Sequence, residues 1–364
     1  MLAVIVAAAS VRGVALADGC PPTTCGITGN TVPGSNLLVV RSGGQRGSLT
    51  AYDLARRGHR VVLPPGMLSA DGRTFVVART FHGRTTVRRF DATTGSFEST
   101  STVGGRWHLV AVSVDGRRIA LTSWDRSRRR TRFFVPGRGR FVRPGSYDVE
   151  TLSRDGRVLF LVHWKANGYE LQRYDLRTRT LRANPPREGA EGKTEKMSGA
   201  AWTAAATRNG RWLLTLYLKP DGTAFVHALD LTGGPPHCID LPGRGANAFL
   251  SSALALSPRE RVLYVATPAL GQIVRVDLAR LRVARTVHFR TFTHDPVVGA
   301  GPNAAVSSDG RTLAFSNGAW VWRYDTVRAR VRFAATMEND VMALGFGPRE
   351  RLTALVGSTL EVVR

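Results

Sequence analysis

The residues of this chain that could do chemistry are scattered and form no recognised catalytic pattern. None of the eight histidines has a second histidine four residues away, as a zinc site on a helix would require. The sequence contains no phosphate-cradling glycine loop, no nucleophile-elbow serine and no HExxH. We therefore predict no catalytic residues, no metal and no cofactor. An enzyme whose site combines single residues from different repeats stays open, because such a site leaves no local motif.

Aromatic residues stand beside charged ones in several short connections. Exposed aromatic side chains next to charge are typical of recognition surfaces. We take these residues as the candidate site for a ligand or partner: Arg106, Trp107, His108, Trp124, Asp125, Trp164, Tyr169, His294 and Asp295. The alternative is that each tryptophan fills a gap between neighbouring sheets.

The charge of the chain is strongly positive, with 51 basic residues against 27 acidic ones and a formal net charge of +24. That excess predicts attraction to polyanions. One basic patch lies on the predicted third and fourth strands of one repeat and on their connecting turns: Arg126, Arg128, Arg129, Arg130, Arg132, Arg138, Arg140 and Arg143. The alternative is a solvated basic surface without a dedicated ligand. No groove-reading helix or aromatic strand platform is evident, so we expect no sequence-specific nucleic-acid recognition.

The elements that position these residues are short strands in a repeated phrase, seen most clearly in Val306–Asp325. A strand runs into a Ser-Asp-Gly-Arg turn, a second strand follows, and a third ends on an aspartate. Two apolar runs joined through Asp-Gly indicate a hairpin. The phrase recurs seven times at a period of roughly 40–50 residues, typical of propellers. We predict an all-β propeller of four-stranded antiparallel blades, seven in number, with eight left open.

The turns themselves carry a ring of arginines, including Arg73, Arg117 and Arg311. Nearly every turn also brings an acidic residue beside its arginine. We therefore expect the charges to cancel locally and the residues mainly to set the turn.

The repeat resembles the propeller superfamily of WD-repeat, TolB-like and YVTN-type proteins. The resemblance extends from about Asn36 to the C-terminus and rests on four phrases: Ser69–Arg73, Ser113–Arg117, Ser153–Arg157 and Ser307–Arg311. It implies fold and not activity, since these families include scaffolds, binding proteins and enzymes. The Gly-His signature of true WD repeats is absent.

The N-terminal residues predict export. Residues 1–17 are apolar and end in Ala-Leu-Ala, which indicates a signal peptide cleaved before Asp18. Residues 18–35 form an irregular lead-in, and residues 36–364 form the propeller. We favour a disulfide between Cys20 and Cys25 over two free thiols, because an exported chain permits it. Cys238 is expected to be a buried small hydrophobe.

Two expectations concern how the chain is joined. The first and last segments each lack a strand, so we expect them to complete one sheet and hide its edges. The connection Ala183–Gly199 has no apolar period and is expected to be a disordered excursion, or alternatively a lid.

These observations together favour a secreted, extracytoplasmic and monomeric protein with no transmembrane span in the mature chain. We expect it to bind a protein or an anionic polymer at the cell envelope without catalysis. The alternative is a propeller enzyme, either a lactonase-like hydrolase or a quinone-dependent dehydrogenase. Its site would lie at the channel mouth near His108, Asp125, His294 and Asp295.

Overall fold

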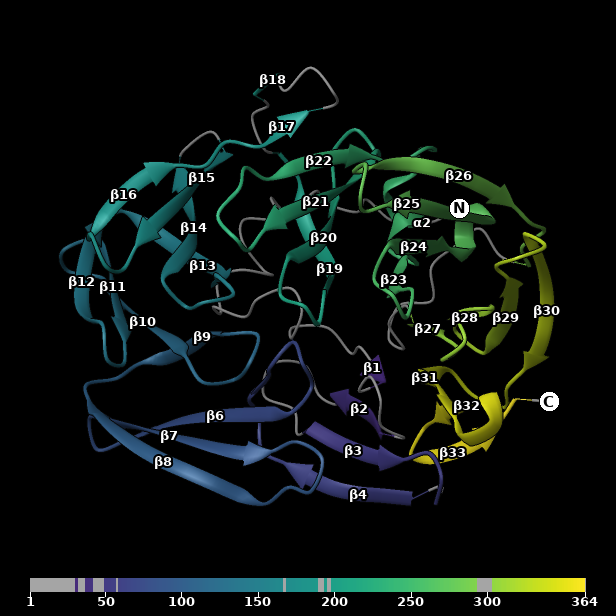
Figure 1. Ribbon diagram of the computed structural model, residues 1–364, viewed down its shortest axis with the longest axis horizontal. Coiled ribbons are helices and arrows are strands. Elements are labelled where there is room, and N and C mark those ends of the chain that lie inside the picture. Colours follow the sequence, from purple (N-terminus) through teal and green to yellow (C-terminus); the bar gives the residue numbers. More distant parts are fainter. Residues whose placement is uncertain are drawn as a thin grey trace, which may run out of the picture.

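Eight sheets surround a common centre, each with an inner strand near the middle and an outer strand at the periphery (Figure 1). The computed structural model describes residues 30–31, 37–41, 49–56, 58–165, 168–188, 193–194, 198–292 and 303–363. Six sheets have four strands, one has six and the last has three. We number them as blades 1–8 along the chain. The predicted signal peptide and the Cys20–Cys25 disulfide lie outside the described residues.

The strands follow the chain in regular order. Blades 1–4 comprise β1 to β4 (Asn30–Thr31, Leu37–Arg41, Leu49–Asp53, Gly58–Leu63), β5 to β8 (Met67–Leu68, Thr74–Phe81, Arg84–Asp91, Phe97–Gly104), β9 to β12 (His108–Val112, Ile119–Asp125, Arg130–Val135, Gly139–Pro144) and β13 to β16 (Ser146–Leu152, Val158–Lys165, Gly168–Asp175, Thr180–Ala183).

The second half repeats the arrangement. Blade 5 comprises β17 to β22 (Arg187–Glu188, Lys193–Thr194, Ala200–Ala206, Trp212–Leu218, Ala224–Asp230, His237–Asp240), and blades 6–8 comprise β23 to β26 (Ala253–Leu256, Val262–Thr267, Gln272–Asp277, Arg282–His288), β27 to β30 (Asn303–Val306, Thr312–Asn317, Trp320–Asp325, Arg330–Thr336) and β31 to β33 (Val341–Gly347, Arg351–Val356, Thr359–Val362). The helical segments are short: α2 (Ala246–Phe249), η2 (Pro268–Leu270) and η3 (Pro348–Glu350).

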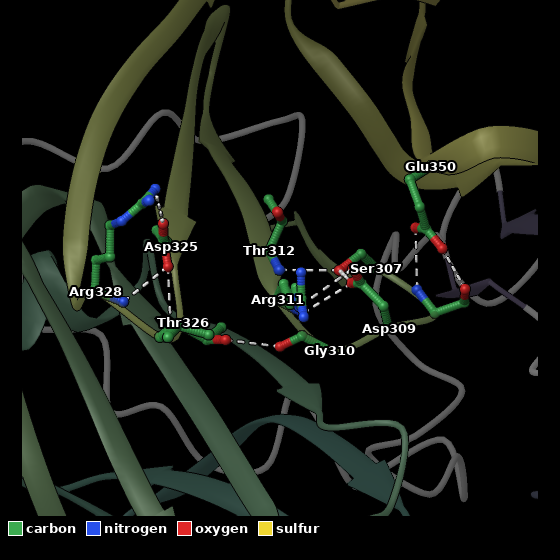
Figure 2. Close-up of polar contacts among 11 residues, drawn as sticks. Ser307, Asp309, Gly310, Arg311, Thr312, Asp325, Thr326, Arg328 and Glu350 are labelled. Carbon is green, nitrogen blue, oxygen red and sulfur yellow. Dashed lines mark hydrogen bonds and ion pairs between the residues drawn. The ribbon is translucent and has the colours of Figure 1, made fainter.

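The repeated turn is held by its own side chains, as Figure 2 shows for blade 7. Ser307 Oγ donates to Asp309 Oδ1 at 2.6 Å, and Asp309 Oδ1 also accepts the Arg311 N–H. The N–H of Thr312 donates back to Ser307 Oγ. Gly310 has a φ of 72°, a left-handed conformation that glycine adopts without strain. The turns at Ser69, Ser113 and Ser153 have the same Ser–Asp bond, so the recurring letters encode a rigid turn.

The aspartate that ends most third strands caps the next turn. Asp325 Oδ1 accepts the N–H groups of Val327 and Arg328, and Asp277 does the same for Ala279 and Arg280. Such Asx turns satisfy backbone groups that the strands leave unpaired. We call the side of the ring that carries these two kinds of turn the Asp-Gly face.

A buried apolar cluster fills each of the eight interfaces between successive blades, including the interface between blade 8 and blade 1. At that last interface Leu38, Val40 and Leu54 pack against Ala343 and Leu355. The propeller fold and its four-stranded blades are thus confirmed. The count of seven is not confirmed: eight sheets close the ring, which is the alternative that the sequence left open.

The termini do not complete one sheet, contrary to expectation. β1, inside the predicted lead-in, pairs with β2 and supplies the inner strand of blade 1. β33 pairs with β32 in a separate sheet. The ring closes because the faces of blades 1 and 8 pack together.

The connection Ala183–Gly199 is also more regular than expected where it is described. β17 pairs in parallel with β22, the outer strand of blade 5, through Arg187 and Glu188 opposite His237 and Cys238. β17 therefore covers an edge that would otherwise be unpaired.

Candidate functional site

Trp107 lies between blades 2 and 3. It is 3% exposed, its indole N–H donates to the Gly104 carbonyl, and its backbone N–H donates to Thr85 Oγ1. The guanidinium groups of Arg132 and Arg140 lie 5.5 and 5.8 Å from the centre of its ring. This tryptophan fills a gap between blades, as the alternative interpretation has it, and it anchors two arginines of the basic patch.

The other predicted residues of blade 3 do not converge. Arg106 and His108 are exposed, and His108 lies opposite Thr122, three residues before Asp125 along β10. Asp125 accepts hydrogen bonds from Ser127 Oγ and the Arg128 N–H, which lower its pKa. Trp124 is 44% exposed. His294 and Asp295 lie outside the described residues.

Trp164 and Tyr169 do come together, where blade 4 faces blade 5. Their ring centroids are 5.2 Å apart, and Trp164 Nε1 donates to Asp148 Oδ2 at 2.5 Å. Burial raises the pKa of Asp148 to about 6, against the opposing effect of the Trp164 hydrogen bond. Tyr169 packs with Tyr217 of blade 5 in a buried cluster. This interface collects the described side chains whose pKa values are most perturbed; we call it the blade 4–5 seam.

Glu150 and His227 form the buried centre of the blade 4–5 seam. Glu150 is 4% exposed on β13, at a bulge between Val149 and Thr151, and His227 is fully buried on β21. Glu150 Oε1 lies 3.6 Å from His227 Nε2, and neither atom has a hydrogen bond to a described residue. Thr215, opposite His227 on β20, also has no partner for its hydroxyl among the described residues.

Burial sets the charge of this pair. It raises the pKa of Glu150 to about 8 and, with the nearby His237, lowers the pKa of His227 to about 3. At neutral pH the carboxyl is therefore protonated and the imidazole is neutral, although their spacing is within the range of an ion pair. A protonated acid beside a neutral imidazole resembles a general acid–base pair. Its full burial fits better with a polar contact between two blades.

The sequence did not single out Asp148, Glu150 or His227. Each belongs to an ordinary strand of its own blade, and the relation between them exists only when blades 4 and 5 pack together. The one local signal was the presence of acidic residues at inner-strand positions that are apolar in other copies. Within the described ranges no group of three or more His, Cys, Asp or Glu side chains could hold a metal ion.

The arginines of the basic patch occupy the outer two strands of blade 3 and their turns. Asp125 is the acid among them, and it pairs with Arg130 at 3.4 Å. Arg140 also donates to the Gly104 carbonyl, and Arg143 lies 5.0 Å from the centre of the Tyr174 ring. Arg126, Arg128 and Arg129 are exposed in the turn between β10 and β11. We call this set the arginine surface.

Three arginines of the repeated turns form ion pairs with the aspartate of the same turn. Arg117 lies 3.8 Å from Asp115, Arg157 lies 3.5 Å from Asp155, and Arg311 lies 4.0 Å from Asp309. Arg211, in the Asn-Gly copy, stacks on Trp212 instead. These contacts agree with the expectation that the turn residues mainly set the turn.

Eight face-packed sheets around a centre define this protein as a β-propeller. The Dos1 propeller, a solved structure, matches with a TM-score of 0.53 and 11% sequence identity, over 94% of this chain and 92% of its own. Hydrazine synthase from Kuenenia stuttgartiensis matches with a TM-score of 0.47 and 13% identity, over 91% and 99% of the two chains. Apo AztD from Citrobacter koseri matches with a TM-score of 0.44 and 12% identity, over 84% and 95%.

The likeness to the Dos1 propeller shows the fold alone, because proteins of different function share it. No protein-family model and no curated protein matches the sequence. None of the helices in the described part of the chain has the length and apolar character to cross a membrane.

Proposed function

We propose that this protein is a non-catalytic propeller that binds an anionic polymer of the cell envelope through the arginine surface. The observation that carries the proposal is the clustering of eight arginines on the outer strands of one blade, with one acidic residue beside them. Binding of this kind rests on release of counterions from the polymer and weakens as salt rises. Export to the envelope remains part of the proposal and rests on the apolar residues 1–17.

Preorganisation supports the proposal. Arg132 and Arg140 hold their guanidinium groups against Trp107, and Arg140 is further fixed by the Gly104 carbonyl. A cation held by stacking loses less side-chain freedom when it meets an anion than a freely rotating one does. Arg126, Arg128 and Arg129 add exposed charge in the neighbouring turn.

The test is retention on an immobilised polyanion, with heparin and polyphosphate as the two probes. We replace Arg128, Arg129, Arg130 and Arg132 with Gln. The matched control replaces four exposed arginines of blades 6 and 7, which removes the same charge: Arg282, Arg285, Arg330 and Arg332. We expect the first variant to elute at clearly lower salt, with the salt dependence of log K reduced by roughly 0.7 per lost contact. Equal shifts in both variants would mean that net charge, and not this surface, governs binding.

A propeller enzyme is the second candidate, and the blade 4–5 seam is the observation that favours it. Asp148 and Glu150 have raised pKa values next to Trp164 and Tyr169, and perturbed pKa values cluster at functional sites. A lactonase-like hydrolase would turn over lactones, and a quinone-dependent dehydrogenase would carry a bound quinone after purification. Protein that is free of quinone and inactive on lactones and alcohols would leave the binding function.

A further inference from the structure

A groove of about 410 Å³ opens on the Asp-Gly face between blades 3 and 4. It is lined by Asp115, Arg117, Arg118, Pro136, Arg154 and Asp155. Its volume falls in the range of small-molecule sites, roughly 300–1,000 Å³. The groove lies apart from the blade 4–5 seam, and its lining shares no residue with the arginine surface.

The turn after β11 differs from the corresponding turns of other blades. In five other blades, the residue after the third strand donates its N–H to the carbonyl of the arginine in the Asp-Gly turn or its equivalent, as Thr326 does to Arg311 at 2.9 Å. Figure 2 shows how close these two turns lie in blade 7, where Thr326 Oγ1 also reaches the Gly310 carbonyl. In blade 3 the third strand ends at Val135 before the chain comes opposite Arg117, and Pro136 follows, which has no N–H to donate. The register of β10 and β11 places Arg138 opposite Arg117, and the Arg138 N–H donates to the Val135 carbonyl instead. Among the described residues, no backbone hydrogen bond joins these two turns of blade 3, where the groove forms.

The two aspartates in the groove are already neutralised. Asp115 is partly desolvated, which raises its pKa, but it accepts Ser113 Oγ and the Arg117 N–H and pairs with the Arg117 side chain. Together these contacts outweigh desolvation and lower the pKa. Asp155 has the same contacts with Ser153 and Arg157. Neither carboxylate cancels the two remaining cations of the groove.

Those two cations are Arg118 and Arg154, and neither forms an ion pair with a described residue. A comparison within the ring shows that this is unusual. Arg208 occupies the position of Arg154 one blade later, and its Nε lies 3.5 Å from Glu260 of blade 6. The residue that faces Arg154 from blade 5 is Gly210, which offers no carboxylate.

Both arginine side chains also contact the turn of the next blade. A Cβ on Gly156 would come within 2.0 Å of Arg118 Cδ, so the Arg118 side chain runs directly across the blade 4 turn. A Cβ on Gly210 would come within 3.0 Å of Arg154 Cγ. The aliphatic part of each side chain therefore lies against the turn of the next blade; Arg118 is partly buried there, and Arg154 is exposed. Two guanidinium groups that line one groove suit a tetrahedral oxyanion, since each presents paired N–H donors.

From this geometry we infer that the groove binds a phosphoryl or sulfuryl group through Arg118 and Arg154, with space beside it for the rest of a small ligand or for the end of a polymer. This site goes beyond the proposed function, because it lies on the Asp-Gly face and requires none of the arginines of the arginine surface.

The experiment is calorimetric titration at constant ionic strength with inorganic phosphate, sulfate and glycerol 3-phosphate, and with acetate as a carboxylate probe. We expect saturable binding of the tetrahedral anions. Arg118→Gln with Arg154→Gln should weaken it about tenfold or more. Arg208→Gln, which removes an arginine already paired with Glu260, should leave it within about twofold. Tighter binding of glycerol 3-phosphate than of phosphate would assign the rest of the groove to an organic ligand, and equal binding would assign it to a polymer end.

Two further variants separate the possible failures. If the double Gln variant does not fold, Arg118→Lys with Arg154→Lys keeps the charge and the packing of the stems but loses the paired donors, and we expect it to bind about threefold or more weakly. The variant of the arginine surface, in which Arg128, Arg129, Arg130 and Arg132 are replaced with Gln, should bind phosphate like the wild type even if it no longer binds heparin. Three results would each overturn the inference. The wild type would fail to bind phosphate at constant ionic strength, the folded Gln or Lys variant would bind phosphate as well as the wild type, or only the variant of the arginine surface would lose phosphate binding.

Discussion

Replacing Glu150 with Gln should make the protein more stable at alkaline pH, because the wild-type carboxyl must stay protonated to remain buried. Burial raises its pKa from 4.5 to about 8. Folding therefore favours the protonated form, and the stability it contributes is full below pH 4.5 and is lost as the pH rises towards 8. The glutamine side chain of the variant keeps the shape of the protonated acid and is neutral at every pH.

The size of the effect follows from the shift. One pKa unit corresponds to about 1.36 kcal/mol, so the free energy of unfolding of the wild type should fall by roughly 1.4 kcal/mol per pH unit relative to the variant in the middle of this range. Between pH 6 and pH 8 the difference amounts to roughly 2 kcal/mol, because the slope flattens near the folded-state pKa. His227 acts in the opposite direction. Its pKa is lowered from 6.5 to about 3, so its contribution is present above pH 6.5 and is lost towards pH 3 in both proteins.

Urea unfolding at pH 5, 6, 7 and 8 measures this difference directly. Glu98→Gln is the control, because Glu98 is exposed on β8 and should give a curve parallel to the wild type. If the Glu150→Gln curve also runs parallel to the wild type, Glu150 ionises as it does in water, and the argument from burial is wrong.

Three further predictions concern the ring and the chain ends. Removing Thr359–Arg364 deletes β33 and the buried Val363 and exposes the edge of β32. The free energy of unfolding should therefore fall by at least about 3 kcal/mol in urea titrations. A loss below about 1 kcal/mol would show that β33 is dispensable. Glu260→Ala should cost about 1–2 kcal/mol in the same assay, because Glu260 Oε1 accepts the Arg208 N–H at 2.6 Å, whereas Glu260→Gln keeps an acceptor and should cost less. Equal costs for Ala and Gln would argue against this bond. The intact mass of exported protein should correspond to a chain that begins at Asp18, and reduction should raise it by the hydrogens of one disulfide; retention of Met1 would contradict the signal peptide.

The fold was predictable because its signal is local. Ser307, Asp309 and Gly310 lie within one turn, and their hydrogen bonds depend on no other part of the chain. The number of blades was harder to predict, because the turn phrase occurs seven times and blade 1 has none. The sequence between β1 and β2 contains no Asp-Gly, so a count of turns leaves that blade out.

The candidate site was only partly predictable. Trp164 and Tyr169 were visible as aromatic residues near charge, and the structure brings them together. Asp148, Glu150 and His227 were not, because their perturbed pKa values arise from burial between two blades. The groove likewise combines Arg118 of blade 3 with Arg154 of blade 4, and the residue that faces Arg154 is a glycine of blade 5. A single sequence records neither relation as a motif.

The way in which blades 1 and 8 meet has a consequence for how the protein folds. Leu38 and Ala343 come from opposite ends of the chain, and they meet through side-chain contact without a shared strand. Such a contact has a large loop-closure entropy in an unordered chain, which favours its formation after the intervening blades have stacked. The stack then holds the two faces at a high effective concentration. The interface between blades 1 and 8 should accordingly form last and open first. Its amide protons should exchange with solvent sooner than those of the other interfaces.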